Sequence, residues 1–458
     1  MEFLFFGFVR KKGIENKKKE FKMSRTVQLI FAMVCFISIG FVDEVNAQVV
    51  DSLILSNAIK EAVDSHPTIL QAQEALKMAD ARIALSKSNY MPTVEGNASF
   101  SNIGPVPSVE FAGRSFKMAP QNSYNAGVSI SQLVYDFGRN SYGDAIEEES
   151  KNLAGINIEQ AKQRIAASVV NSFFSLVYLQ NALAIKEEQL RTLTKHLEFV
   201  LKKKETGSAT EYEVLSTKVR ISSIESQKTD IEAAKGIQQS VMNTLLGRDV
   251  NAVILVANSI SSQSFGMDLG TVYKYALSNR RDLVAIYEKT KIAELRYKFT
   301  RSQNNPTLAA FATGGLKNGY MPYLGDPKLN YVVGLSLKVP LFDANKKENN
   351  SLLAQSSIVN SRLDEELMRR SISIEIVEAR LNIESAKRRV KQVELQLQQA
   401  IKALYLAEVS YNAGAITNLD LLDATTSLSE SQLSSLKAKV DYAVSTYRLK
   451  VAMGDNLY

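Results

Sequence analysis

Cysteine and histidine are scarce in this sequence, and their scarcity excludes several kinds of chemistry. The 458 residues include one cysteine, Cys35, and two histidines, His66 and His196. Cys35 lies in an apolar run near the N-terminus, so the rest of the chain has neither a disulfide nor a reactive thiol. The two histidines lack metal-ligand spacing, and no nucleophile elbow or phosphate-binding loop occurs. We therefore expect no enzyme activity, no metal site and no cofactor.

Long apolar runs and strong charge are also missing. After residue 47 the sequence has no run of about 20 apolar residues, the length that a transmembrane helix needs. Any part of the chain that spans a membrane is therefore expected to consist of strands. The formal net charge is +7, of which the first 47 residues contribute +3. The remaining +4 is too small to indicate a nucleic-acid partner.

The N-terminus has the features of a secretory signal peptide. Arg25 precedes the apolar run VQLIFAMVCFISIGFV, residues 27–42, and the small residue Ala47 follows it. A basic segment, a short apolar run and a small residue at the cleavage site define such a signal. Residues 1–47 are thus predicted to be removed, with Met23 as an alternative start. Val34 is too large for the position before a lipidated cysteine, so we expect no lipid anchor at Cys35.

An internal repeat organises the rest of the chain. The segment ETGSATEYEVL at 205–215 resembles NAGAITNLDLL at 412–422, and LVYDFG around Asp136 resembles PLFDAN around Asp343, both 207 positions apart. Upstream, Pro92 matches Pro306 at an offset of 214. We predict repeat 1 at 48–247, a linker at 248–268 and repeat 2 at 269–458. Each repeat would contain a helix, two strands, a very long helix, a tight tip and a second long helix.

The predicted strands alternate apolar and polar side chains. In YNAGVSISQLV, residues 124–134, Tyr124, Ala126, Val128 and Ile130 share one face. In NYVVGLSLKV, residues 330–339, every second residue from Tyr331 to Val339 is apolar. Segments of about 10 residues with this alternation are typical of a transmembrane β-barrel, although a half-buried strand of a soluble sheet has the same period. The strand pairs are expected at about 93–134 and 307–340. Because a barrel needs about 8 strands, four strands per chain could close only by pooling several chains.

Two predicted helices are unusually long. The stretches from Asp136 to Gly207 and from Asp343 to Gly414 each extend about 100 Å at 1.5 Å per residue. Both carry heptad spacing, which is typical of a coiled coil. The seam of the second helix consists of Ile383, Val390, Leu397, Leu404 and Tyr411, with Ala386, Val393, Ala400, Ala407 and Gly414 beside it. Each repeat is therefore expected to end in an antiparallel helical hairpin.

Several residues are assigned to the ends of these helices. Pro92 and Pro306 should separate the first helix of each repeat from its strands. Asp136 and Asp343 have the position of N-caps for the long helices. Thr210 with Glu213, and Thr417 with Asp420, have the spacing of a capping box.

With this order of elements, the sequence resembles the TolC-like outer-membrane efflux family over nearly all of the chain after residue 47. The most specific match is Y-x-x-G followed by D-x-L-D-A-T-T, which occurs here from Tyr411 to Thr426. The resemblance implies a mainly α fold of mixed class, in which three chains of four strands each form a 12-stranded β-barrel. Twelve long helices would continue the barrel as a coiled-coil tunnel. The family performs no bond chemistry.

The resemblance also implies a location and partners. The protein would be a homotrimer in lipid of the Gram-negative outer membrane, with its tunnel in the periplasm. An inner-membrane pump and a periplasmic adaptor, also called a membrane fusion protein, would engage the inner end of the tunnel. The residues matching the family's adaptor-docking tips are Gly207, Ser208, Ala209, Gly414, Ala415 and Ile416. These glycines also have a simpler role, since they allow the chain to reverse between helices.

The acidic residues after the second tip have two interpretations that can coexist. Asp420 can serve as a helix cap. By resemblance, Tyr411, Asp420, Asp423 and Glu213 would surround the inner mouth of the tunnel as a periplasmic gate, in which rings of carboxylates favour cations. Asp420 and Asp423 lie one helical turn apart, where like charges repel. The family often has a basic residue where this chain has Ile416, so the usual lock on the gate is absent or rebuilt.

Three functions remain open at this point. The first is the outlet channel of a three-part efflux system for drugs or other small molecules. The second is the exit duct of a type I protein secretion system, and the third is a secreted coiled-coil scaffold without a pore. The segment from Asn102 to Ser123, with Phe111 and Phe116, would face outward in the first two cases, or be a flexible hairpin connection.

Overall fold

The computed structural model describes residues 52–258, 260 and 269–458, which belong to one compact unit, Ser52–Tyr458. The predicted signal peptide and part of the predicted linker lie outside the described residues. The helices are α2 (Leu55–Ser65), α3 (Pro67–Ser88), α4 (Arg139–Glu205), α5 (Glu211–Leu246), α6 (Leu269–Asn279), α7 (Arg281–Ser302), α8 (Lys346–Asn412) and α9 (Asn418–Met453). The strands are β1 (Thr93–Asn102), β2 (Ser108–Phe111), β3 (Arg114–Lys117), β4 (Asn122–Tyr135), β5 (Thr307–Lys317) and β6 (Lys328–Lys338).

Corresponding elements keep the offsets seen in the sequence. Helices α4 and α8 both have 67 residues, α5 and α9 both have 36, and each pair is displaced by 207 positions at both ends. The single helix expected before each pair of strands is wrong, because the chain forms two helices there. His66 and Arg280 both have extended backbone conformations, and Pro67 occupies the first position of α3, so α2–α3 and α6–α7 are each interrupted.

Four strands form one antiparallel sheet in the order β1-β4-β5-β6. The pairing of β4 with β5 joins segments that are far apart in the sequence. Residues paired across strands share a face, and one face is apolar on all four strands. This apolar face of the sheet consists of Val94, Gly96, Ala98 and Phe100 in β1, Tyr124, Ala126, Val128 and Ile130 in β4, Leu308, Ala310, Ala312, Gly314 and Leu316 in β5, and Leu329, Tyr331, Val333, Leu335 and Leu337 in β6.

Glycine permits close approach at two points on the opposite face of the sheet. A Cβ added to Gly315 would lie 2.3 Å from the carbonyl oxygen of Ala126, and one added to Gly334 would lie 2.7 Å from the ring of Phe311. Phe311 therefore packs directly over the backbone of Gly334. Larger residues would push β4, β5 and β6 apart.

The connection between β1 and β4 is an ordered hairpin. Strands β2 and β3 pair antiparallel and turn at Ala112 and Gly113, both of which have positive φ. The backbone bond from Met118 N to Pro107 O extends the hairpin, and the bond from Ile103 N to Gln121 O extends the pairing of β1 with β4 towards it, each at 2.8 Å. The connection expected from Asn102 to Ser123 therefore contains two further strands.

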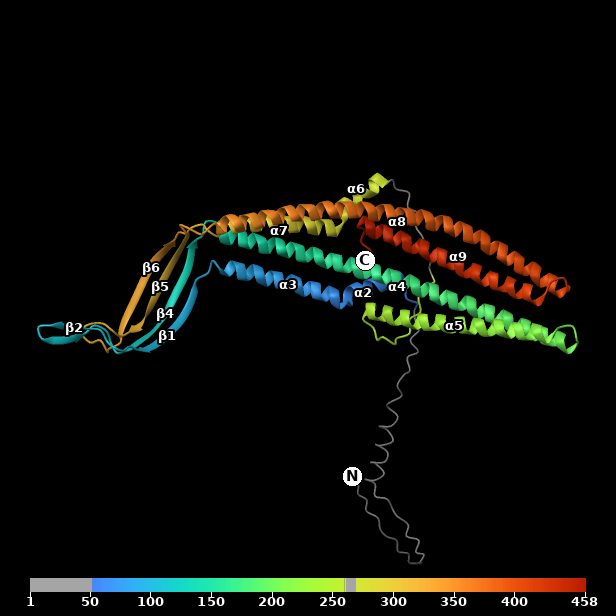
Figure 1. The fold of residues 1–458 in the computed structure, drawn as a ribbon, viewed down its shortest axis with the longest axis horizontal. Coiled ribbons are helices and arrows are strands. Elements are labelled where there is room, and N and C mark those ends of the chain that lie inside the picture. Colours follow the sequence, from blue (N-terminus) through green and yellow to red (C-terminus); the bar gives the residue numbers. More distant parts are fainter. Residues whose placement is uncertain (1–51, 259, 261–268) are drawn as a thin grey trace, which may run out of the picture. The chain divides into compact units, whose positions relative to one another are not determined.

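The helices continue the sheet as a layer with the same order. Each strand of the main sheet adjoins a helix along the chain, and α3, α4, α7 and α8 lie side by side in the order of β1, β4, β5 and β6 (Figure 1). Farther from the sheet, α4 packs against α5 and α9, and α9 packs against α8. The turns from α4 to α5 and from α8 to α9 lie together at the end opposite the sheet (Figure 1).

The starts of the long helices differ from the prediction. Gly138 and Asn345, rather than Asp136 and Asp343, occupy the N-cap positions, because positive φ angles at 137–138 and 344–345 delay the helices. The predicted caps still act from outside the helix. Asp136 Oδ2 accepts from Asn140 N at 2.7 Å, and Asp343 Oδ2 accepts from Lys347 N at 2.9 Å. Pro92 and Pro306 lie directly before β1 and β5, after the helices have ended.

The main hydrophobic core surrounds the middle of α4. Phe173, Phe174 and Val177 pack there with residues of α2, α5 and α9. Helix α4 contains an 18-residue window apolar enough to cross a membrane, with 44% of it buried in the protein. Packing of α4 against neighbouring helices accounts for part of this apolar composition.

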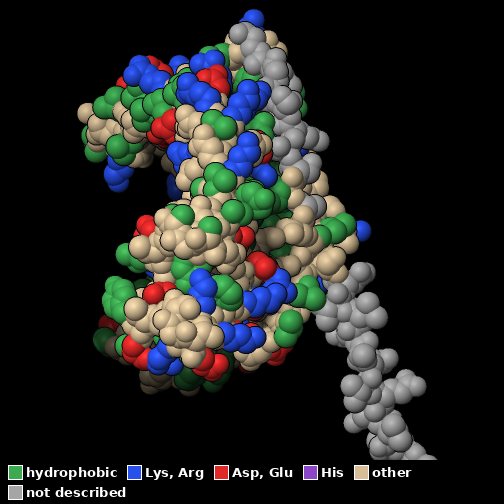
Figure 2. Space-filling model, turned by 90° about the vertical axis from the view of Figure 1, so that its right-hand side faces the viewer, with side chains coloured by type: hydrophobic (Ala, Val, Ile, Leu, Met, Phe, Trp, Pro, Cys, Tyr) green, Lys and Arg blue, Asp and Glu red, His purple; other side chains and the backbone are tan. Residues whose placement is uncertain are grey.

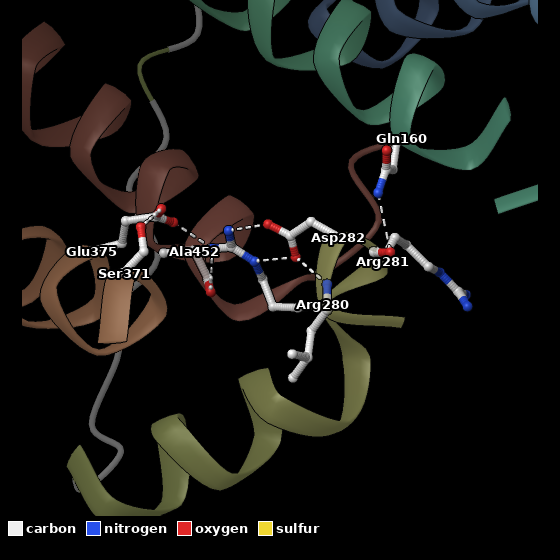
Figure 3. A network of polar contacts seen from close by, with 8 residues as sticks. Gln160, Arg280, Arg281, Asp282, Ser371, Glu375 and Ala452 are labelled. Carbon is white, nitrogen blue, oxygen red and sulfur yellow. Dashed lines mark hydrogen bonds and ion pairs between the residues drawn. The ribbon is translucent and has the colours of Figure 1, made fainter. Parts of the chain in front are cut away.

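A buried arginine, Arg280, connects α7, α8 and α9. Arg280, between α6 and α7, donates to Asp282 at 2.5 and 3.0 Å, to Glu375 of α8 at 2.5 Å and to the carbonyl of Ala452 at 3.2 Å (Figure 3). The Ala452 carbonyl lies at the end of α9, where no later turn of the helix supplies an N–H donor for it. Burial acts to lower the pKa of Arg280, but the bonds to the two carboxylates hold it above its usual value. Burial acts to raise the pKa of Asp282, but the ion pair holds it below its usual value.

Candidate gate at the helical tips

Both tips reverse the chain in the same way. Gly207 and Gly414 each have φ of +75°, a conformation that favours glycine. Ser208 N donates to Lys203 O at 2.8 Å, and Ala415 N donates to Ser410 O at 2.9 Å. These bonds satisfy carbonyls at the helix ends in a Schellman arrangement. The tip glycines thus have a structural role whether or not a partner docks there.

The helices leaving the tips begin with reciprocal caps. Thr210 Oγ1 accepts from Glu213 N at 3.2 Å, and Glu213 Oε1 accepts from Thr210 N at 3.3 Å. Thr417 Oγ1 accepts from Asp420 N at 3.3 Å, and Asp420 Oδ2 accepts from Thr417 N at 2.9 Å. Bonds from the Thr417 hydroxyl and backbone hold the pKa of Asp420 below its usual value. Asp420 therefore stays ionised and hydrogen-bonded to Thr417 in the cap of α9.

Tyr411 is the buried centre of the tip region. Its hydroxyl donates to Glu213 Oε2 at 3.3 Å, which connects α8 to α5. The ammonium of Lys203 lies 4.4 Å from the centre of its ring, and the ring of His196 meets it edge-on at 5.4 Å. Burial, together with the Glu213 carboxylate, raises the pKa of Tyr411 to about 12. The phenol therefore stays a hydrogen-bond donor at neutral pH.

Asn418 forms a second connection between the two helical pairs. Its amide nitrogen donates to acceptors on α5, namely Glu213 O at 3.3 Å, Ser216 Oγ at 3.3 Å and Thr217 Oγ1 at 3.2 Å. The amide oxygen is then left to accept from His196 Nε2 at 2.6 Å. His196 consequently carries a proton on Nε2. Because Asn418 is buried, all of these bonds are shielded from water.

Asp423 has a partner that the sequence did not reveal. Arg220 of α5 donates to Asp423 Oδ1 at 2.9 Å. Asp420 and Asp423 each have a partner in the single chain, since the first is held by its cap and the second by an ion pair. The pairing of Arg220 with Asp423 supplies basic charge that Ile416 does not provide.

Two cavities flank Tyr411. One, of about 370 Å³, lies between the tips and is lined by Lys203, Ser208, Tyr212, Gly414, Ile416 and Leu419 among others. The other, of about 390 Å³, is lined by His196, Phe199, Glu408 and Leu421 among others. Gly207, Ser208, Gly414 and Ala415 are exposed, whereas Ala209 and Ile416 are half-buried. Seen from the tip end, the surface mixes basic and acidic side chains rather than presenting one broad apolar patch (Figure 2).

The structure thus brings Tyr411, Glu213, Asp420 and Asp423 to one end of the helical layer. Sequence reasoning missed His196, Lys203, Arg220 and Asn418, because their roles depend on which helices lie side by side. Asn418 had one visible signal, its place directly after the cap residue Thr417. Among the described residues, no three His, Cys, Asp or Glu side chains are arranged to hold a metal ion.

Comparisons with known proteins agree with this architecture. The chain is 20% identical over 408 residues to outer membrane protein TolC of Vibrio cholerae, covering 87% of this chain and 90% of the relative. It is 20% identical over 342 residues to alkaline protease secretion protein AprF of Pseudomonas aeruginosa, covering 73% and 70%. The crystal structure of outer membrane protein VceC from Vibrio cholerae superposes with a TM-score of 0.73 at 20% identity, covering 88% of this chain and 97% of that one.

A match to a family model shows which protein family the chain belongs to. The profile described as outer membrane efflux protein matches residues 58–248 and 272–455, which together include most of the chain and both helical tips. The chain belongs to the outer membrane efflux protein family.

Proposed function

We propose that three copies of this chain form a continuous duct through which small molecules leave the cell across the periplasm and the outer membrane. Family membership places the protein in the Gram-negative outer membrane, among channel proteins. The trimer, its closed barrel and its partners are the proposal. The observation that carries it is the apolar face of the sheet, which is exposed on a sheet with two open edges.

The sheet requires both lipid and further strands. Leu329, Tyr331 and Val333 of β6 are exposed in the single chain, as is the rest of the apolar side of this strand. Strands β1 and β6 are the edges of the four-stranded sheet, with no neighbour on their outer sides among the described residues. An open, apolar edge promotes pairing with another chain. Pairing β1 of one copy with β6 of the next would close the sheet, and three copies would give 12 strands.

The helical layer has matching open edges. Exposed apolar side chains occur along α8 on one edge and along α3 and α5 on the other. Those on α8 are Leu352, Leu353, Val359, Leu363, Leu367, Ile374, Leu381, Leu395, Tyr405 and Leu406, and those on the other edge are Leu70, Met78, Leu85, Tyr212, Leu215, Val219 and Ile237. Different edges that meet head to tail produce a closed ring. The same rotation that closes the sheet would thus close the helices into a tunnel, with two internal repeats per chain.

The tips would form the inner mouth of this tunnel. Asp420 and Asp423 of three copies would place six carboxylates around the opening, which favours cations. The Arg220–Asp423 pair and the Tyr411–Glu213 bond both join the α4–α5 pair to the α8–α9 pair. Opening the mouth by moving these pairs apart would break both contacts. A periplasmic adaptor that inserts between the tips, and an inner-membrane pump behind it, would supply that movement.

An exit duct for secreted proteins is the second candidate, and the similarity to AprF favours it. Both candidates use the same duct. A secreted scaffold without a pore would leave the apolar face of the sheet unexplained.

Reconstitution in planar bilayers tests the proposal. Detergent-solubilised protein should have the mass of a trimer and give stepwise conductance that divalent cations reduce. The double variant Asp420→Asn with Asp423→Asn should lose most of this block while remaining trimeric. A water-soluble monomer without affinity for detergent, or a trimer that never conducts even after Arg220→Ala, would refute the duct.

A further inference from the structure

The hairpin formed by β2 and β3 has an apolar face that nothing covers within the described chain. Val109 pairs with Phe116, and Phe111 pairs with Arg114, so these four side chains share one face. Ser108, Glu110, Ser115 and Lys117 occupy the other face. The exposed fraction of Phe111 is 75%, and Val109 and Phe116 are also exposed. An isolated two-stranded hairpin is marginal in water, so this face needs a partner.

Lipid tails are a poor partner because of where the hairpin lies. Strands β1, β5 and β6 have 10 or 11 residues each, which matches the length needed to cross the hydrocarbon of a membrane. The hairpin begins six residues beyond the end of β1, on the side away from the helices (Figure 1). In the proposed barrel it would therefore project past the hydrocarbon layer into water.

A second exposed aromatic group emerges at the same end of the sheet. The β5–β6 connection, residues 318–327, carries Tyr320, Met321 and Tyr323, and Tyr323 is 67% exposed. This connection is ordered, because Gly319 N donates to Leu324 O at 2.9 Å and Asn330 Nδ2 donates to the Tyr320 hydroxyl at 3.0 Å. Asn318 fixes its base to β4 by accepting from Tyr124 N at 2.8 Å and donating to Asn122 O at 2.7 Å.

Strand order makes the two connections neighbours twice, within a chain across β4 and β5 and, in a closed ring, between copies across β6 and β1. Within the chain they do not cover each other, since Phe111 and Tyr323 both stay exposed. The β2–β3 hairpin follows the edge strand β1, and the 318–327 connection precedes the edge strand β6. Closing the sheet places β1 of one copy beside β6 of the next. The hairpin of one copy and the 318–327 connection of its neighbour would then stand next to each other at every junction.

We propose that the apolar face of the β2–β3 hairpin packs on the Tyr320–Met321–Tyr323 side chains of the adjacent copy, forming an aromatic collar at the outer mouth. This rests on the proposed trimeric duct. Aromatic pairs at such a contact add to the burial of apolar area. The collar would fasten each junction at the end opposite the helical tips and restrict the outer opening.

Cross-linking between copies tests the collar. Residues 48–458 contain no cysteine, so introduced thiols are the only ones in that part of the chain. Two differently tagged forms, one with Phe111→Cys and one with Tyr323→Cys, are coexpressed and treated with a short, flexible bismaleimide. A cross-linked product carrying both tags is expected from the native trimer. Glu110→Cys, on the polar face of the same hairpin, should give much less product with Tyr323→Cys.

Thiol reactivity gives a second readout that does not depend on cross-link geometry. In the trimer, Phe111→Cys should react with a water-soluble maleimide several-fold more slowly than Glu110→Cys. Equal rates would overturn the collar. Protection of Phe111→Cys only in lipopolysaccharide-containing nanodiscs, without cross-linking, would assign the face to lipid and also overturn it. A conducting trimer that fails these tests would leave the duct intact, whereas a monomer would remove the basis of both proposals.

Discussion

The α4–α5 and α8–α9 pairs have equal lengths and equal tips, yet they bury different amounts of side chain. Helix α4 buries sixteen of its 67 residues, whereas α8 buries six of its 67. In the shorter helices the order is reversed, with fifteen buried residues in α9 and six in α5. Helices α4 and α9 therefore form the interior of the single chain, while α5 and α8 form its edges. The two long helices have similar heptad spacing, but α4 uses it for contacts within the chain, whereas α8 leaves most of its apolar side chains exposed.

The largest expected effect contrasts matched positions in α4 and α8. Phe174 is 2% exposed in the main core, and Leu381, 207 positions later, is 50% exposed. Phe174→Ala should lower the free energy of unfolding by about 3–5 kcal/mol because it leaves a cavity. Leu381→Ala should leave the single chain nearly as stable but weaken the proposed trimer. Thermal unfolding followed by circular dichroism, with trimer dissociation in rising detergent, separates the two outcomes.

The comparison would fail if Leu381→Ala destabilised the fold as much as Phe174→Ala, because that result would mean that α8 packs fully within the chain. Lys387, which is exposed on the same helix, provides a polar control. Lys387→Ala should leave the unfolding of the chain nearly unchanged and should weaken the trimer less than Leu381→Ala does.

The second prediction concerns the junctions that precede α3 and α7. Arg280 and His66 are corresponding residues, but Arg280 is buried in a network of carboxylates, whereas His66 only accepts from Thr68 N at 3.2 Å. Arg280→Met should cost about 3 kcal/mol, since it leaves partly buried carboxylates unpaired. His66→Ala should cost about 1 kcal/mol, the usual effect of losing a cap. Chemical denaturation measures both.

The network also predicts a pH dependence. Burial opposes ionisation of Asp282, but the bonds from Arg280 hold the pKa of this carboxyl below its usual value. The stabilisation is therefore present above the ordinary aspartate pKa, about 4, and is lost as pH falls from there through the lowered value. Arg280→Met should flatten the acid side of the stability curve, and an unchanged curve would contradict the role given to this ion pair.

The third prediction compares the first residues of α9 and α5. Asn418 is buried and holds α5 and His196, whereas Glu211, 207 positions earlier, is exposed and pairs with Lys204. Asn418→Leu should cost about 1–3 kcal/mol because buried donors and acceptors lose their partner. Glu211→Ala should change stability very little, because its ion pair with Lys204 is exposed to water. Chemical denaturation of both variants measures the difference, and equal effects would show that the tip network adds nothing specific.

Sequence patterns predicted the elements better than the contacts between them. The proline positions, the alternation of β4 and β6 and the heptads of the long helices are local properties, and these elements occur near the expected places. The break at Arg280 was missed because arginine carries no local signal for an extended conformation. The break at His66 did have a local signal, since Pro67 follows it. The N-caps were misplaced because left-handed residues at Phe137 and Ala344 are unusual and depend on how strands turn into helices.

The candidate gate illustrates the same limit. Tyr411, Asp420 and Asp423 are recognisable from a motif, and Glu213 from its capping box. Arg220 and His196 became visible only once α5, α4 and α9 lay beside one another, since pairing across about 200 residues leaves no local pattern. The partners of the acidic residues at the tips could therefore not be predicted from the sequence alone.

The smallest predicted effect tests whether the two tips are equivalent. Both capping boxes have the same geometry, so Thr210→Ala and Thr417→Ala should each lower the free energy of unfolding by about 1 kcal/mol. Their effects on conductance should differ, however. Thr417 holds Asp420, an exposed member of the proposed carboxylate ring, whereas Thr210 holds Glu213, which also accepts from Tyr411. Thr210→Ala should therefore weaken the contact between the helical pairs and raise the open fraction of single channels, while Thr417→Ala should mainly alter divalent-cation block. Identical channel records for the two variants would mean that the caps act on helix stability alone.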